Sequence, residues 1–174
     1  MSSYSLKRVQ ILPISLDEAW DFFSNPANLN DITPTDLKFK ILSNSGSDKM
    51  YAGQIITYTV NPFPGFPVFW MTEITHVKEK EYFVDEQRFG PYAFWHHSHF
   101  FKPVKEGVEM TDIVHYKLPL GPLGRLAHRL FVRKKLNNIF NYRFQTLESH
   151  YHSSQKPPIE LKPQHLTLNT PKSV

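Results

Sequence analysis

Apolar and polar residues alternate with a period of two along most of the chain, and a period near 3.6 appears only on either side of that stretch. Residues 4–12 contain few helix formers and end at Pro13, which is typical of a strand. Ser15 and Glu18 then have the spacing of a capping box, so we expect a helix to begin here. The apolar face of this helix consists of Leu16, Ala19, Trp20 and Phe23. Asn25 and Pro26 end it, and residues 28–32 are predicted to add one more turn.

The alternation between residues 37 and 118 predicts six strands. They span residues 37–43, 54–60, 68–77, 82–89, 94–104 and 108–118. The connectors between them are short and rich in Gly, Pro, Asn and Lys. Because parallel crossovers need about a dozen residues, strands joined this closely are antiparallel neighbours. The middle of the chain is therefore predicted to be an antiparallel meander.

The helical period returns near the C-terminus. Gly121 to Gly124 opens a long helix over about residues 123–150, and nothing in the sequence breaks it internally. Beyond residue 153 the composition turns to Ser, Gln, Lys and Pro. We therefore expect one domain at residues 1–152 and a flexible, Pro-rich tail at residues 153–174.

This order of elements predicts an α+β fold, in which helices cover one face of a seven-stranded, curved antiparallel sheet. One long helix is too narrow to cover seven strands closely. Either bulky side chains fill the gap or a cavity remains between helix and sheet. Aromatic residues make up 14% of the chain, which is compatible with both outcomes.

Composition excludes several classes of function. The chain has no cysteine, so disulfide scaffolds, thiolate metal sites and Cys-based catalysis are ruled out. The net charge of +4 is too small to indicate a nucleic-acid binder by itself, and no motif supports one. A leader-like N-terminus and long apolar runs are missing, which leads us to expect a cytoplasmic protein.

The most specific stretch runs from Phe83-Val84-Asp85-Glu86-Gln87 through Gly90-Pro91-Tyr92 to Trp95-His96-His97-Ser98-His99-Phe100-Phe101. It is followed by Thr111-Asp112, Tyr116 and Pro119-Leu120-Gly121. With these residues the chain, over about residues 4–152, resembles the START-related, birch-pollen-allergen-like helix-grip superfamily known as SRPBCC proteins. Within it, the chain resembles an uncharacterised bacterial branch of ligand-binding, polyketide cyclase-like proteins. The resemblance implies a deep apolar cavity under the C-terminal helix, used to bind hydrophobic molecules and in some branches for catalysis.

Alternation places Trp95, His97, His99 and Phe101 on one face of their strand, and the resemblance favours this face as the one lining the cavity. Across the hairpin closed near Gly90, Asp85 and Gln87 would then lie about 5 Å from the histidines. One interpretation is a polar patch that anchors a ligand or acts as general acid and base. The other interpretations are a buried network that sets strand register, and an exposed His-rich strand.

The candidate ligand-binding residues are Asp85, Gln87, Trp95, His97, His99, Phe101 and Tyr116. The phenol of Tyr116 either meets a ligand or bonds within the core. His97 and His99 beside Asp85 or Asp112 also have the spacing of a metal site. No metal motif accompanies them, so we expect neither a metal nor a cofactor.

Two further groups are candidates for roles at the surface. Phe63 and Phe66 lie in a proline-rich connector, and Gly121 and Gly124 open the long helix, so these four are candidate cavity gates. Residues 113–147 carry seven basic and no acidic residues, which leaves −3 of the +4 total for the rest. Within this segment Arg125, Arg129 and Arg133 form a ridge that is either a solvated helix face or a contact for anionic lipid.

Three functions follow from these features. The first is binding, transport or sequestration of a small hydrophobic or amphipathic ligand such as a lipid, isoprenoid, quinone or polyketide. The second is a cyclase- or dehydratase-like enzyme in which His97 or His99 is the acid or base and Asp85 orients it. The third is a membrane-surface or protein-interaction module that uses the basic helix. The sequence does not indicate the oligomeric state.

Overall fold

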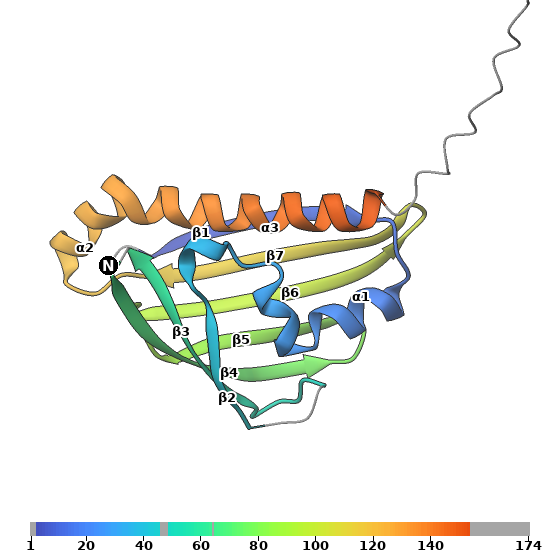
Figure 1. Cartoon of the computed structure of the whole chain (residues 1–174), viewed down its shortest axis with the longest axis horizontal. Coiled ribbons are helices and arrows are strands. Elements are labelled where there is room, and N and C mark those ends of the chain that lie inside the picture. The colour runs from blue at the N-terminus through green and yellow to red at the C-terminus, as the bar shows by residue number, and fades with distance from the viewer. Residues whose placement is uncertain (1–2, 46–48, 64, 154–174) are drawn as a thin grey trace, which may run out of the picture.

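In the computed structural model, residues 3–45, 49–63 and 65–153 are described, and they form an antiparallel sheet with helices packed on it. The strands are β1 (Tyr4–Leu12), β2 (Lys40–Asn44), β3 (Ile55–Phe63), β4 (Phe66–Lys78), β5 (Tyr82–Phe89), β6 (Phe94–Val104) and β7 (Gly107–Lys117). The helices are α1 (Leu16–Phe23), α2 (Gly121–Ala127) and α3 (Arg133–Ser153). Two 3₁₀ turns, η1 (Pro26–Asn30) and η2 (Thr35–Leu37), and a π-helical turn, η3 (His128–Val132), complete the described elements. Figure 1 shows α3 running along the curved sheet, as the α+β prediction requires.

The strand order is β1-β7-β6-β5-β4-β3-β2. Strands β2 to β6 each pair with the next strand in sequence, and β7 also pairs with β1. The predicted antiparallel meander is confirmed, because the short connectors leave no room for crossovers. The bounds of β1, β5 and β6 are those that the sequence pattern predicts, and the other strands differ from prediction by at most three residues at either end.

The first helix begins where the capping pattern places it. Ser15 is its N-cap, and its side chain accepts a hydrogen bond of 3.1 Å from the Glu18 amide. Asn25 does more than end this helix, because its side chain caps η1. The extra turn therefore lies at Pro26–Asn30 and not at residues 28–32. Asn25 starts a new turn by satisfying the free amide of Ala27 at 3.0 Å.

Two predicted boundaries fail because turn geometry overrides strand pattern. The predicted strand at residues 37–43 begins only at Lys40, since Leu37 closes η2 and Lys38 adopts a left-handed conformation with φ of 45°. The connector at residues 61–65 is mostly strand, since β3 continues to Phe63. A register shift between Val60 and Phe63 accommodates Pro62 there, as bulges tolerate proline.

The long C-terminal helix predicted over about residues 123–150 is confirmed, and it contains one π-helical turn that the sequence pattern did not predict. It starts at Gly121, passes through the π-helical turn η3 and continues to Ser153. The wider π turn rotates the helix face and turns His128 inward. There its ring stacks on Tyr4, with centroids 3.5 Å apart, and its Nε2 lies 2.9 Å from the Tyr116 hydroxyl.

The buried apolar side chains form two clusters on the helix-covered face of the sheet. One joins α1 to the sheet and the end of α3 around Trp20, whose ring meets Phe83 and Phe101 edge to face. The other packs Leu136 and Phe140 of α3 against β1 and β7. These two clusters hold the helix at both ends of the sheet and leave the space between them for the site. Of the tail predicted at residues 153–174, residue 153 is the last residue of α3, and residues 154–174 lie outside the described residues. Within the described part, no helix has the length and apolar character needed to cross a membrane.

Candidate functional site

A pocket of about 580 Å³ lies between the sheet and the helices. Strands β3 to β6 supply its floor, and α1, η1, α2, η3 and α3 contribute side chains around it. Most of the lining is apolar or aromatic, as at Ile56, Ile74, Phe83, Leu136 and Phe140. The described residues of β1 and β7 do not line it, because α3 packs directly on that edge of the sheet. The space therefore opens on the side of the sheet that a single helix cannot cover.

One group of ionisable side chains interrupts this apolar surface. Asp85 comes from β5, His97 and His99 from β6, and Arg143 from α3, and all four line the pocket. Asp112 of β7 lies behind them and does not line it. Strand register brings them together, since Asp85 faces His97 and His99 faces Asp112 across the sheet. We call these five residues the ionic cluster.

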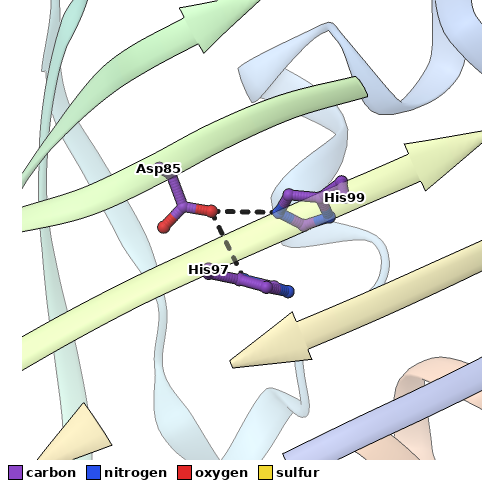
Figure 2. A group of neighbouring side chains, drawn as sticks. All are labelled: Asp85, His97 and His99. Carbon is purple, nitrogen blue, oxygen red and sulfur yellow. Dashed lines mark hydrogen bonds and ion pairs between the residues drawn. The ribbon is translucent and has the colours of Figure 1, made fainter. Parts of the chain in front are cut away.

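Each imidazole of the cluster lies between the two carboxylates. His97 places Nδ1 3.3 Å from Asp85 Oδ2 and Nε2 3.1 Å from Asp112 Oδ1. His99 donates from Nε2 to Asp85 Oδ2 at 2.9 Å, and its Nδ1 lies 2.8 Å from Asp112 Oδ1. Figure 2 shows both rings directed at the same carboxylate oxygen of Asp85. Arg143 approaches Asp112 from the helix side at 3.7 Å.

The cluster sets its own protonation. Burial alone would raise the pKa of Asp85, but the charge of His97 and the hydrogen bonds from both histidines outweigh burial and hold that pKa below its usual range. Burial alone would also raise the pKa of Asp112. Hydrogen bonds from both histidines and the charge of Arg143 outweigh burial and hold that pKa well below its usual value. Burial alone would lower the pKa of His97, but the two carboxylates raise it to about 8. At neutral pH the carboxylates are therefore ionised and His97 is protonated.

The carboxylates of Asp85 and Asp112 differ in their exposure. The Asp85 side chain is 18% exposed, whereas that of Asp112 is 5% exposed. A molecule in the pocket can therefore reach Asp85, and Asp112 acts on it only through the imidazoles and Arg143. This arrangement can accept a hydrogen bond at Asp85 and can hold or release a proton at His97.

The same atoms form a donor set for a divalent cation. One ligand atom each from Asp85, His97 and His99 lies within 4.8 Å of the others, and imidazole with carboxylate is a combination that Zn²⁺ and Fe²⁺ use. These atoms are already paired with one another, and a cation would have to displace the proton that His97 holds.

The other candidate ligand residues lie at different positions. Trp95 lines the pocket. The structure also describes Gln87, Phe101 and Tyr116, and these three do not line it. The amide of Gln87 forms two hydrogen bonds with the backbone of Tyr92, of 2.7 and 3.1 Å, and so holds the hairpin turn. Phe101 packs in the core around Trp20, and the Tyr116 hydroxyl is used by His128. These three side chains support the walls of the pocket from behind.

The candidate gate residues lie at one end of the pocket. Phe63, Gly124 and the helix start at Leu120 line it, and Phe66 lies beyond the lining residues. Gly121 adopts a left-handed conformation with φ of 49°, while Gly124 is buried against the backbone of Pro119. The three arginines of the predicted ridge, Arg125, Arg129 and Arg133, are exposed on α2, η3 and the start of α3.

The sequence indicates Asp112 only as a neighbour of a possible metal site, and Arg143 does not stand out among the basic residues of its segment. Alternation along β7 contained a usable signal for Asp112, which shares the inward face with Met110 and Val114. The helical period contained a weaker one, since Arg143 lies four residues before Leu147, a buried position. Neither pattern specifies that the two side chains meet.

No protein-family model and no curated protein matches the sequence. Solved structures do match it. A protein of Thermus thermophilus superposes with a TM-score of 0.61 at 16% identity, covering 89% of this chain and 100% of that one. Major latex-like protein 151 of Panax ginseng matches with a TM-score of 0.60 at 11% identity over 86% of this chain and 97% of that one. Norcoclaurine synthase of Thalictrum, bound to a transition-state analogue, matches with a TM-score of 0.60 at 16% identity. This match covers 86% of this chain and 96% of that one.

At these identities the likeness concerns the fold. It spans nearly the whole length of each of those chains, so the match involves the full domain and not one motif. The chain therefore has the helix-grip fold, the architecture that its resemblance to the START-related, birch-pollen-allergen-like superfamily implies.

Proposed function

We propose that the protein binds a small hydrophobic or amphipathic molecule in the pocket, with a polar group of that molecule directed at Asp85. The observation that carries this proposal is a largely apolar pocket of about 580 Å³ with one ionic cluster in its lining. Known ligand pockets have about 300–1,000 Å³ and pair an apolar lining with a few polar groups that orient the ligand. Lipids, isoprenoids, quinones and polyketides are ligand classes of this size and polarity.

The ionised Asp85 carboxylate favours a ligand with a hydrogen-bond donor such as a hydroxyl group, because a carboxylate without a proton only accepts. Arg143 nearby adds a donor for a carbonyl oxygen. Both carboxylates already have partners in the two imidazoles and Arg143. An uncharged polar end therefore fits the cluster better than an ion does.

Two adjacent residues of α3 provide a matched test. Ile139 lines the pocket, whereas Asn138 is exposed. We would measure uptake of a hydrophobic fluorescent probe, and native mass spectra of gently purified protein, for Ile139→Trp and Asn138→Trp. The proposal predicts saturable uptake by the wild type and by Asn138→Trp, and loss of uptake by Ile139→Trp. Absence of uptake by the wild type, or equal uptake by both variants, would refute it.

Catalysis of a cyclase- or dehydratase-like reaction is a second candidate, favoured by the protonated His97 within the pocket lining. An imidazole with a pKa of about 8 can deliver a proton near neutral pH, and Asp85 holds its orientation. A structural neighbour, norcoclaurine synthase, shows that this fold also occurs in an enzyme. With a co-purified ligand identified, its conversion over time in wild type and His97→Gln would be followed. Loss of conversion with retained binding supports catalysis, whereas an unchanged ligand in the wild type excludes it.

A further inference from the structure

Large apolar side chains are exposed together at one end of the molecule, where α2, η3 and the β3–β4 hairpin meet. We call these residues the apolar rim: Phe63, Phe66, Leu120, Leu123, Leu126, Leu130 and Phe131. Their exposed fractions run from 40% at Phe131 to 75% at Leu120. A contiguous apolar surface of this kind in a globular protein marks an interaction site.

The hairpin and the helix form one surface. The rings of Phe63 and Phe131 meet edge to face with centroids 5.4 Å apart, which joins the end of β3 to η3. Figure 1 shows α2 at the end of the molecule opposite the β6–β7 hairpin. The rim therefore occupies one pole of the domain.

The apolar rim is also the mouth of the pocket. Phe63, Leu120, Leu123 and Phe131 are both exposed and part of the pocket lining. An apolar molecule that entered between them would pass from the surface of the domain to its interior over a continuous apolar path. A surface that covered the rim would thus seal this path from water.

Backbone conformation adds to the exposure of Leu120. Its φ of 62° lies in the left-handed region, which costs a non-glycine residue about 1–2 kcal/mol. Among the large apolar residues that the structure describes, Leu120 has the highest exposed fraction, 75%. Neither the backbone nor the side chain of Leu120 is favourable in water, so this position fits a role in contact with another apolar phase.

The charged residues next to the apolar rim indicate what kind of partner surface it contacts. Arg125, Arg129, Arg133 and Lys134 are exposed and alternate with rim leucines along the same helical stretch. No acidic residue occurs in the sequence between residues 113 and 147. Basic residues beside exposed leucines are the pattern of helices that lie in the interface of anionic bilayers. A second copy of this chain would instead bring like charges together.

We propose that the apolar rim docks on anionic lipid bilayers, with its leucines in the interface and the adjacent arginines on lipid phosphates. The proposal rests on the proposed ligand-binding function, because docking would let the pocket exchange its ligand with the membrane without exposing it to water. The proposal identifies lipid as the partner of the apolar rim, and it applies to any apolar ligand of the pocket.

Flotation of the full chain with phosphatidylcholine vesicles, with and without phosphatidylglycerol, tests the proposal. We expect flotation with the anionic vesicles at low salt and its loss at high salt. Arg125→Gln with Arg129→Gln should weaken binding roughly fivefold for each arginine removed. Leu126→Ser with Leu130→Ser, at two exposed rim positions outside the pocket lining, should abolish it. Matched controls are Leu42→Ser, which changes an exposed leucine on β2, and Lys102→Gln with Lys105→Gln near the β6–β7 hairpin.

Uptake of the fluorescent probe in lipid-free solution separates this proposal from the proposed function. All variants should keep it, because the mutated residues are exposed and lie outside the pocket lining. Probe uptake without flotation of the wild type would overturn docking and leave ligand binding intact. Flotation that the rim variants share with the controls would also overturn it. A concentration-dependent dimer abolished by Leu126→Ser with Leu130→Ser would assign the rim to a second copy instead.

Discussion

The imidazole rings of His97 and His99 lie with their centroids 3.8 Å apart. Two rings this close can hold positive charge only if negative charge surrounds them, and the two carboxylates of the ionic cluster supply it from opposite sides. The five residues consequently act as one electrostatic unit. Removal of one member changes the environment of all the others.

Asp112→Asn is expected to destabilise the protein by about 3–5 kcal/mol, since Arg143 and His97 lose a buried counter-charge and His99 loses the carboxylate beside its Nδ1. Urea unfolding followed by fluorescence measures the loss. Glu106→Gln removes an exposed carboxylate and should change stability by no more than about 0.5 kcal/mol. If Asp112→Asn were as mild as this control, the ionic cluster would not stabilise the fold.

Stability should decrease as the pH rises through about 8. Folding raises the pKa of His97 above its unfolded value of 6.5, so its contribution is complete below 6.5 and is lost as the pH passes the folded pKa of about 8. The difference corresponds to about 2 kcal/mol. The lowered pKa values of Asp85 and Asp112 act in the opposite direction, and their contribution is lost on acidification.

Unfolding free energies at about pH 6 and about pH 9 check this dependence. His97→Gln should flatten the decrease on the alkaline side, whereas His115→Gln, at an exposed position on β7, should retain it. An identical pH profile in wild type and His97→Gln would contradict the assignment of the titrating group.

Tyr116→Phe tests whether this residue is a ligand group or a structural one. Its hydroxyl bonds to His128 and is outside the pocket lining, so we expect a loss of about 1–2 kcal/mol in stability and unchanged probe binding. Equilibrium unfolding and probe titration are measured on the same preparation. A drop in probe affinity at unchanged stability would restore the ligand role that the sequence suggested.

Two glycines at the helix start should respond differently to substitution. A β-carbon at Gly124 would collide with the Pro119 carbonyl oxygen, so Gly124→Ala should displace the helix start and cost about 1–3 kcal/mol. Gly121 has open space around it, and Gly121→Ala meets only the strain of its φ of 49°, about 1 kcal/mol. Thermal unfolding ranks the two variants. The rate of probe release would show in addition whether Gly124 acts as a gate, and an equal effect of both changes would argue against the packing role.

Local sequence determined the strands, because side-chain alternation and short connectors depend only on neighbours along the chain. Those patterns were enough to put Asp85 and the two histidines on neighbouring strands of one hairpin, and the register of the structure pairs Asp85 with His97. They also placed Ser15 at the start of α1, where a side-chain hydrogen bond within three residues decides the boundary.

Alternation could not decide which face of β6 is the inner one, since both faces carry aromatic residues and histidines. The packing of α3 on β1 and β7 decides it, and the outer face then carries Glu86, which pairs with His96 at 2.9 Å. Asp112 and Arg143 meet only because α3 returns across the sheet, 31 residues later in the chain. Long-range packing of this kind forms the ionic cluster, the pocket and the inward position of His128 in the π turn. The strands that carry these features follow from the alternation of apolar and polar residues along the chain.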